Sequence, residues 1–284
     1  MIRKRTFWGI TAGLFTIAVP VVHAEGHGPI FGLATPTLGE GQWSSDTAVM
    51  SLATEEDTAV MFREMLGYGL TPDLQFMLTF PIGPTDDLMM PPNMRTGSMM
   101  AGFGDVEAGL LWRFDRVAPG VGKRSESTLI TSVLVPSGDD QRRGIEVTAG
   151  MHLAAVTGYA SRSTYWWVGG GTQLRKEANG DRLGNLYYLT GVFGWRPPVF
   201  RGDYPKPDWR IFLEGVAEFA ARDRNNGATI GNSGGQRVLL GPSMLGLFGT
   251  WGIEGGVLFP IEQSLNGNHD EEDYRAKLVV TYWF

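Results

Sequence analysis

Methionine is concentrated in one short stretch of this 284-residue sequence. Residues 86–102 read DDLMMPPNMRTGSMMAG and hold five of the 12 methionines. A thioether sulfur is a soft ligand suited to Cu(I), and it is equally an adaptable apolar group that packs on greasy surfaces. The stretch contains no histidine or cysteine, which weakens a metal site but leaves it open. The candidate residues are Met89, Met90, Met94, Met99 and Met100, with Met77 on the preceding apolar segment.

Charged side chains recur at alternate positions of several apolar segments. In residues 208–222, for example, Arg210, Glu214 and Glu218 alternate with large apolar side chains. A period of two places the two kinds of residue on opposite faces of a β-strand. The set predicted to face inward comprises Glu107, Arg113, Glu146, His152, Arg210, Glu214, Glu218, Arg222, Glu254, Arg275 and Lys277. Mixed charges in a confined interior either line a selective polar path or pair with one another and plug it.

The last twelve residues indicate which kind of sheet positions these side chains. Residues 273–284 read DYRAKLVVTYWF, with both cations on one face and aromatic or aliphatic residues on the other. The segment is long enough to cross a bilayer as a tilted strand, and it ends on Phe284. This pattern is typical of the closing strand of a bacterial outer-membrane β-barrel.

Eleven further segments bring the number of expected strands to twelve. They cover residues 46–55, 58–70, 74–82, 105–115, 126–135, 145–156, 164–176, 186–196, 208–222, 236–247 and 250–262. An even number returns both chain ends to one side, as in bacterial barrels. We therefore predict an all-β fold with a single closed antiparallel transmembrane barrel, of the Gram-negative outer-membrane type, over residues 46–284. The adjacent Arg63 and Glu64, and Pro242 inside a strand, are expected to form local bulges.

The first 24 residues have the pattern of a secretory signal peptide. Arg3, Lys4 and Arg5 precede an apolar run, and the small residues before Ala24 predict cleavage near that position. Residues 25–45 are then expected to form an N-terminal segment in the periplasm. An exported chain without cysteine has no disulfide framework, so packing or closure of a sheet must supply stability. The net charge of −6 argues against nucleic acid as a partner.

The closing strand also predicts the orientation of the barrel. With Phe284 at the periplasmic rim, residues 83–101 form a long extracellular connection. A connection with five methionines and two adjacent prolines is expected to fold over the barrel mouth as a lid rather than stand free in water.

Three segments of the chain resemble a known family. They read LGYGLTPDLQFMLTFPIG at 66–83, GFGDVEAGLLWRF at 102–114 and LITSVLVPSGD at 129–139. Their sequences and their order are similar to the recurrent strands of the "MetA-pathway of phenol degradation" family of outer-membrane proteins. The resemblance covers most of the chain after the signal. It implies a barrel that moves small hydrophobic or aromatic molecules, and it assigns no catalytic or binding residue.

These patterns predict a barrel for passive passage or capture of a small solute. The first alternative is a methionine-rich protein that handles copper or silver. A lipid-modifying barrel enzyme is a third class, and we do not expect it, because His152 is the one histidine on a predicted strand and no G-x-S-x-G nucleophile elbow is expected. No cofactor is expected. The expected partners are outer-membrane lipid and lipopolysaccharide, the barrel assembly machinery through the Phe284 strand, and the solute.

Overall fold

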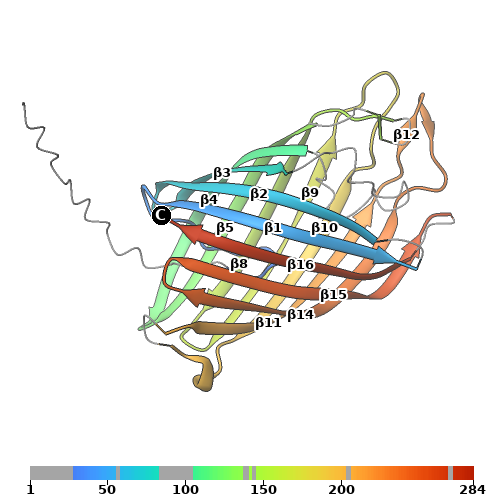
Figure 1. The fold of residues 1–284 in the computed structure, drawn as a ribbon. Coiled ribbons are helices and arrows are strands. Elements are labelled where there is room, and N and C mark those ends of the chain that lie inside the picture. The colour runs from blue at the N-terminus through green and yellow to red at the C-terminus, as the bar shows by residue number, and fades with distance from the viewer. Residues whose placement is uncertain are drawn as a thin grey trace, which may run out of the picture.

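Twelve β-strands close into one antiparallel barrel in the computed structural model (Figure 1). The structure describes residues 28–55, 58–82, 105–136, 141–142, 145–202, 206–267 and 271–284. The barrel strands are β1 (Trp43–Thr54), β2 (Thr58–Thr71), β3 (Leu74–Pro81), β4 (Asp105–Gly120), β5 (Lys123–Pro136), β8 (Gly150–Ala160), β9 (Thr164–Arg175), β10 (Leu186–Trp195), β11 (Asp208–Ala220), β14 (Gly235–Phe248), β15 (Trp251–Leu265) and β16 (Glu272–Trp283). Each pairs with its neighbours in chain order, and β1 pairs with β16 to close the sheet. The predicted all-β, twelve-stranded barrel is confirmed.

Three small elements lie in the connections between barrel strands. They are the paired strands β6 (Gln141–Arg142) and β7 (Ile145–Glu146), the paired strands β12 (Arg224–Asn225) and β13 (Ala228–Thr229), and the 3-10 helix η2 (Pro198–Phe200). The strand expected to begin at residue 145 therefore begins at Gly150 instead. Within the described residues, no helix has the length and apolar character needed to cross a bilayer.

Alternation along the strands gives the barrel an apolar outer surface. On β16, Leu278 is 50% exposed and Val280 37%, whereas Arg275 and Thr281 are each 1% exposed because they face inward. At the end of the barrel that holds the C-terminus, successive ring contacts join Tyr68, Trp43, Phe284, Tyr282 and Trp251. An apolar wall edged by aromatic rings is what a lipid bilayer requires of a spanning barrel.

No bulge interrupts β2 at Arg63 and Glu64, so that prediction is wrong. The register with β1 and with β3 is continuous through both residues. Arg63 points inward toward Glu107, whereas Glu64 points outward and accepts hydrogen bonds from the hydroxyls of Ser45 at 2.5 Å and Thr47 at 2.7 Å. Because the neighbouring strand supplies two donors, a regular strand tolerates a carboxylate on the apolar face.

The bulge predicted at Pro242 is also absent. The register between β14 and β11 runs straight through this residue. Proline has no N–H to donate, and pairing with β15 is missing at Gly241 and Pro242 and resumes at Ser243. The irregularity of this strand lies between Val238 and Leu239 instead. Two unpaired positions between β14 and β15 thus occur where the bulge was expected.

The two ends of the barrel differ in their connections. At the Phe284 end, β2–β3, β4–β5 and β14–β15 are joined by two-residue turns. The opposite end carries both small two-stranded sheets. Outer-membrane barrels have short periplasmic turns and longer extracellular loops. We therefore call the Phe284 end periplasmic and the opposite end extracellular.

Candidate functional site

Residues 28–42 are here called the plug; residues 28–38 lie inside the barrel, whereas Glu40 and Gly41 are exposed at its rim, where Gly41 bonds to Gly69 of β2. The backbone N–H groups of Ile30, Phe31 and Gly32 donate to the carboxylate of Glu214 on β11, at 3.0, 2.8 and 2.7 Å. Glu214 is fully buried, and the hydroxyl of Ser243 also donates to it. Three successive N–H groups that converge on one carboxylate form a nest of the kind that binds anions. The expectation that residues 25–45 lie outside the barrel in the periplasm is therefore wrong for the described part of this segment.

Thr35 anchors the plug nearer the periplasmic end. Its hydroxyl donates to Glu126 at 3.2 Å and accepts from the indole N–H of Trp167 at 3.0 Å. Its carbonyl accepts from the hydroxyl of Thr128 at 2.7 Å. Thr35 and its partners are all buried, so these bonds are shielded from competing water.

The plug is bound around the circumference of the lumen. Lys277 on β16 donates to the carbonyl of Ile30 at 2.9 Å, and the N–H of Leu38 donates to Gln75 on β3 at 2.9 Å. One apolar cluster packs plug against wall; it contains Ile30, Phe31, Ala48, Met50, Met61, Val216, Leu239, Leu258 and Val279. Because its partners come from β3, β5, β9, β11 and β16, the plug obstructs the lumen.

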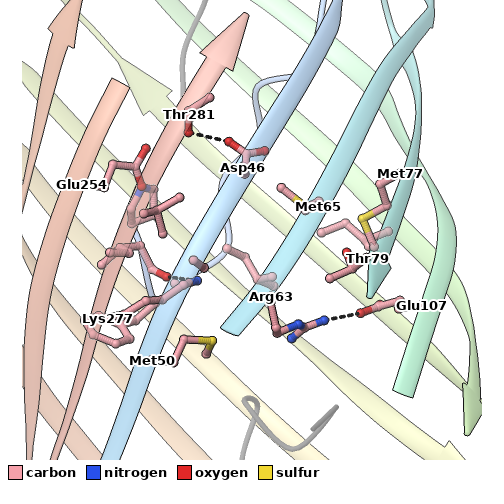
Figure 2. Close-up of a pocket in the computed structure, with 18 of the residues that line it drawn as sticks. Asp46, Met50, Arg63, Met65, Met77, Thr79, Glu107, Glu254, Lys277 and Thr281 are labelled. Atoms are coloured by element: carbon pink, nitrogen blue, oxygen red, sulfur yellow. Dashed lines mark hydrogen bonds and ion pairs between the residues drawn. The ribbon is translucent and has the colours of Figure 1, made fainter. Parts of the chain in front are cut away.

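A cavity of about 320 Å³ remains between the plug and the barrel wall (Figure 2). Its apolar lining includes Ile30, Phe31, Met50, Met65, Met77, Leu111 and Ile130. Its polar lining consists of Asp46, Arg63, Thr79, Glu107, His152, Glu254, Lys277 and Thr281. The volume falls within the range of sites that hold small molecules. The lining suits a small molecule that is largely apolar but carries a polar group.

Glu107 organises one polar corner of the cavity. Its carboxylate lies 3.7 Å from Arg63 and 3.0 Å from His152 Nδ1, and it also accepts from the hydroxyl of Ser132. The other imidazole nitrogen, Nε2, lies 2.5 Å from the hydroxyl of Tyr188. Both nitrogens of His152 are therefore occupied, and within the described residues no serine is hydrogen-bonded to this histidine. Among the described residues, a serine nucleophile paired with this histidine is therefore not assembled, and the hydroxyl that His152 contacts is that of Tyr188.

Ser233 lies in GNSGG at 231–235, which matches G-x-S-x-G, so the expectation that the chain lacks this motif is wrong. Its hydroxyl donates to the carbonyl of Ile230 at 2.9 Å and accepts from the N–H of Asp223 at 2.8 Å. A nucleophile elbow joins a strand to a helix, whereas this segment leads from a loop into β14. Ser233 therefore stabilises a turn.

Glu254 lies in another part of the cavity wall (Figure 2). It is 6% exposed, and within the described residues its Oε1 has no hydrogen-bond partner. The neighbouring Asp46 accepts a hydrogen bond from the hydroxyl of Thr281. A buried carboxylate oxygen without a donor is a site at which a bound molecule can place an O–H or N–H group.

Many of the other lumen charges pair with one another. Arg275 donates to Glu218 and to Glu272 at distances between 2.8 and 3.1 Å, and all three side chains are buried. Two further buried pairs join Arg113 to Glu126 and Arg175 to Asp105. The sequence left open whether the inward charges pair and plug the lumen or line a selective polar path. These ion pairs fit the first alternative, whereas the polar side chains that line the cavity fit the second.

Nine of the eleven charged residues predicted to face the lumen do so. They are Glu107, Arg113, His152, Arg210, Glu214, Glu218, Glu254, Arg275 and Lys277. The prediction is wrong for Glu146, which lies in β7 and accepts from the side chain of Asn179 at 2.8 Å. It is also wrong for Arg222, which is exposed beyond the end of β11, near Asn266. In both cases the alternating pattern continues past the extracellular end of the barrel strand, into a loop.

Methionine side chains line the inner wall of β1, β2 and β3. Met77 faces the lumen as predicted and borders the cavity with Met50 and Met65 (Figure 2). Met61 is completely buried on the same wall. The five methionines from Met89 to Met100 lie outside the described residues, so the lid and the soft-metal site remain predictions.

Sequence reasoning missed several residues that close the lumen. The plug has no strand periodicity, and nothing in its sequence indicates that it lies inside the barrel. The missed charged residues face inward. They lie on strands whose alternation is less regular, at the first position of a regular segment (Asp105) or just before one (Glu272); the set is Asp46, Arg63, Asp105, Glu126, Arg175 and Glu272. Extending the alternation rule to those strands would have indicated most of them.

Asp181 connects the loops at the extracellular end. Its carboxylate accepts the backbone N–H groups of Glu146 at 2.9 Å and Asn226 at 2.6 Å. These two hydrogen bonds, first that from Glu146 and then that from Asn226, lower the pKa of Asp181 below its ordinary value of 3.8. The carboxylate thereby ties β7 to the turn between β12 and β13.

Comparison with known proteins agrees with the architecture. No family model matches the chain, and no curated protein is similar to it in sequence. The COG4313 outer membrane channel from Pseudomonas putida F1 is similar in structure, with a TM-score of 0.58 and 11% identity over 88% of this chain and 98% of that one. The NanC porin is similar with a TM-score of 0.51 and 7% identity, over 84% of this chain and 98% of that one. Such low identities establish the outer-membrane barrel fold alone.

Proposed function

We propose that the chain is an outer-membrane channel for passive passage of a small solute, and that the plug closes it in the state described here. The observation that carries the proposal is a chain segment bound inside a barrel whose outer wall is apolar. Barrels of eight strands are filled by side chains, and those of sixteen or more hold an aqueous channel. Twelve strands leave room for a plug and a cavity, and release of the plug would join that cavity to the periplasmic mouth.

The cavity favours a small solute that is mostly apolar and carries a hydrogen-bond donor. Met50, Met65 and Met77 present adaptable apolar surface to such a molecule. The unpartnered Oε1 of Glu254 can accept a hydrogen bond from it. A phenol or an aromatic alcohol has both features, which agrees with the solute class implied by the resemblance to the MetA-pathway family.

Planar-bilayer recording tests this proposal. The full chain without its signal is compared with a variant that also lacks residues 25–42, and phenol and glucose are added in turn to each. We expect rare openings of the intact protein, frequent openings of the truncated one, and interruption of the current by phenol but not by glucose. Equal conductance of the two proteins would contradict the role of the plug. Equal effects of the two solutes would contradict the solute class.

The inward methionines support copper or silver handling as a second candidate function. Soft thioether ligands from Met50, Met65 and Met77 border one cavity. Titration with Ag(I), followed through the methionine methyl resonances, distinguishes the two functions. Shifts confined to these methyl groups at one equivalent would favour metal binding, and their absence would end that hypothesis.

A lipid-modifying activity remains the competing enzyme class. The Glu107–His152–Tyr188 chain is the arrangement from which such an activity would have to arise. Phospholipase and acyltransferase assays of the purified protein and of its His152→Ala variant test this directly. Turnover by the natural protein that disappears in the variant would overturn the channel proposal.

A further inference from the structure

A second cavity, of about 430 Å³, lies at the periplasmic mouth. It is bordered by the β4–β5 hairpin, the β8–β9 turn and the adjoining ends of β10 and β11. Six cations line it: Arg116, Lys123, Arg124, Arg162, Arg196 and Arg210. Within the described residues, no acidic side chain is part of the lining. We call this cavity the basic pocket.

One carboxylate behind the basic pocket is shared by three arginines. Glu126 lies 3.8 Å from Arg116 and 3.4 Å from Arg124. It is also bound at 3.0 Å by Arg113, which lies deeper in the barrel wall and pairs in addition with Asp73 at 2.9 Å. The single negative charge of Glu126 therefore neutralises the positive charges of Arg116 and Arg124 only in part.

The opposite wall of the basic pocket has a similar excess of positive charge. The carboxylate of Asp208 lies 2.6 Å from the guanidinium of Arg196 and 3.6 Å from that of Arg210, so one carboxylate is paired with two arginines. Lys123 and Arg162 are exposed, and in the described part of the chain neither forms an ion pair. Two carboxylates thus face six cations, on a chain whose overall charge is negative.

Tyr165 indicates that the basic pocket faces the barrel mouth rather than lipid. Its side chain is 6% exposed, and its ring stacks on that of Trp167, 5.9 Å away, in an inward-facing cluster. The guanidinium of Arg210 lies 5.2 Å from the centroid of the Tyr165 ring. Trp166, the neighbour on the outward face of the same strand, is 41% exposed. A ligand would therefore enter from the periplasm and not from the bilayer.

We propose that the basic pocket binds a small polyanion that carries carboxylate or phosphate groups. Clustered cations in a concave site focus a positive potential, and guanidinium groups bind these oxyanions in a two-pronged geometry. The volume is that of a small-molecule site, which favours a compact ligand over an extended protein segment. This site goes beyond the channel function, and binding to it can be measured whether or not the lumen conducts.

Isothermal titration calorimetry of the full chain without its signal, in neutral detergent, tests the proposal. Citrate serves as the carboxylate probe and inorganic phosphate as the phosphate probe. The test variant combines Arg116→Gln, Lys123→Gln and Arg162→Gln, which leave the shorter ion pairs of Glu126 with Arg113 and Arg124 intact. The control variant removes three extracellular cations through Lys176→Gln, Arg222→Gln and Arg224→Gln.

We expect saturable binding of citrate, phosphate or both at low salt, at least about tenfold weaker in the test variant and unchanged in the control. Affinity should also fall as salt concentration rises. Absence of binding by both probes, or equal weakening in the two variants, would overturn the proposal. Binding of a polyglutamate peptide without binding of either probe would overturn it in favour of an acidic protein segment.

Discussion

Replacing Glu214 with alanine removes the acceptor that holds the plug. Three backbone N–H groups donate to this carboxylate at 3.0, 2.8 and 2.7 Å. A hydrogen bond to a charged group contributes about 1.5–3 kcal/mol. The three hydrogen bonds act as one unit and their contributions do not add, so we take about 3 kcal/mol as the free energy by which Glu214→Ala weakens binding of the plug. Since 1.4 kcal/mol corresponds to a factor of ten, the released plug should become roughly a hundredfold more populated.

Single-channel recording measures that population as the open probability. The Glu214→Ala variant should open about a hundredfold more often than the natural protein, up to full occupancy of the open state. The Glu214→Gln variant retains one acceptor oxygen and should lie between the two. The matched control is Glu64→Gln, which makes the same chemical change on the outer face of the barrel. Its gating should be unaffected.

Two results would refute this reasoning. The Glu214→Ala variant could have the open probability of the natural protein while a variant lacking residues 25–42 is open. The plug would then close the lumen, but Glu214 would not anchor it. If neither variant opens, the plug is not what closes the lumen. Heat-modifiable migration on gels must first show that both variants form barrels.

Three further predictions concern stability. The Glu64→Gln change removes a carboxylate from the lipid-facing surface and should raise the free energy of unfolding by about 1 kcal/mol in guanidinium titrations; a decrease would contradict the assignment of that face. The Arg275→Gln change removes the cation that binds both Glu218 and Glu272 and leaves Glu272 with the more distant Arg237, at 3.9 Å. It should lower the free energy of unfolding by about 3 kcal/mol; a loss below about 1 kcal/mol would count against the buried cluster. Because folding lowers the pKa of Asp181, its stabilisation is complete above pH 3.8 and is lost as the pH falls through the lowered value. Hydrogen exchange at the amide of Asn226, corrected for the intrinsic effect of pH, should therefore lose protection in acid, and Asp181→Ala, which removes the acceptor, should show that loss already at neutral pH; protection that is independent of pH in both proteins would contradict this.

The strands could be predicted from the sequence because a barrel wall imposes a strict period of two. On β16 the outward Leu278, Val280 and Tyr282 alternate with buried residues, of which Arg275 and Thr281 are polar. This pattern, together with the eleven other segments, predicted the closed sheet. The same rule placed nine charged residues correctly. It placed Glu146 and Arg222 wrongly, because alternation does not show where a strand leaves the sheet.

The plug could not be predicted, because long-range contacts place it rather than local periodicity. Ile30 and Glu214 are separated by 184 positions in the chain and meet through a backbone donor that no sequence pattern reveals. The bulge at Arg63 and Glu64 was predicted wrongly for a similar reason, since the hydroxyls that satisfy the outward Glu64 come from the neighbouring strand. Contacts of this kind depend on the register between strands, which the sequence did not determine.

Disulfide trapping tests most directly whether the plug closes the lumen. A Cβ atom at Gly32 would lie 2.4 Å from a methyl carbon of Val192 on β10, and the natural chain has no cysteine. Gly32→Cys and Val192→Cys are therefore combined with Glu214→Ala, and single channels are recorded before and after addition of a reductant. The account predicts a closed channel while the disulfide is intact and frequent openings after reduction. An open probability that is the same in both states would contradict it.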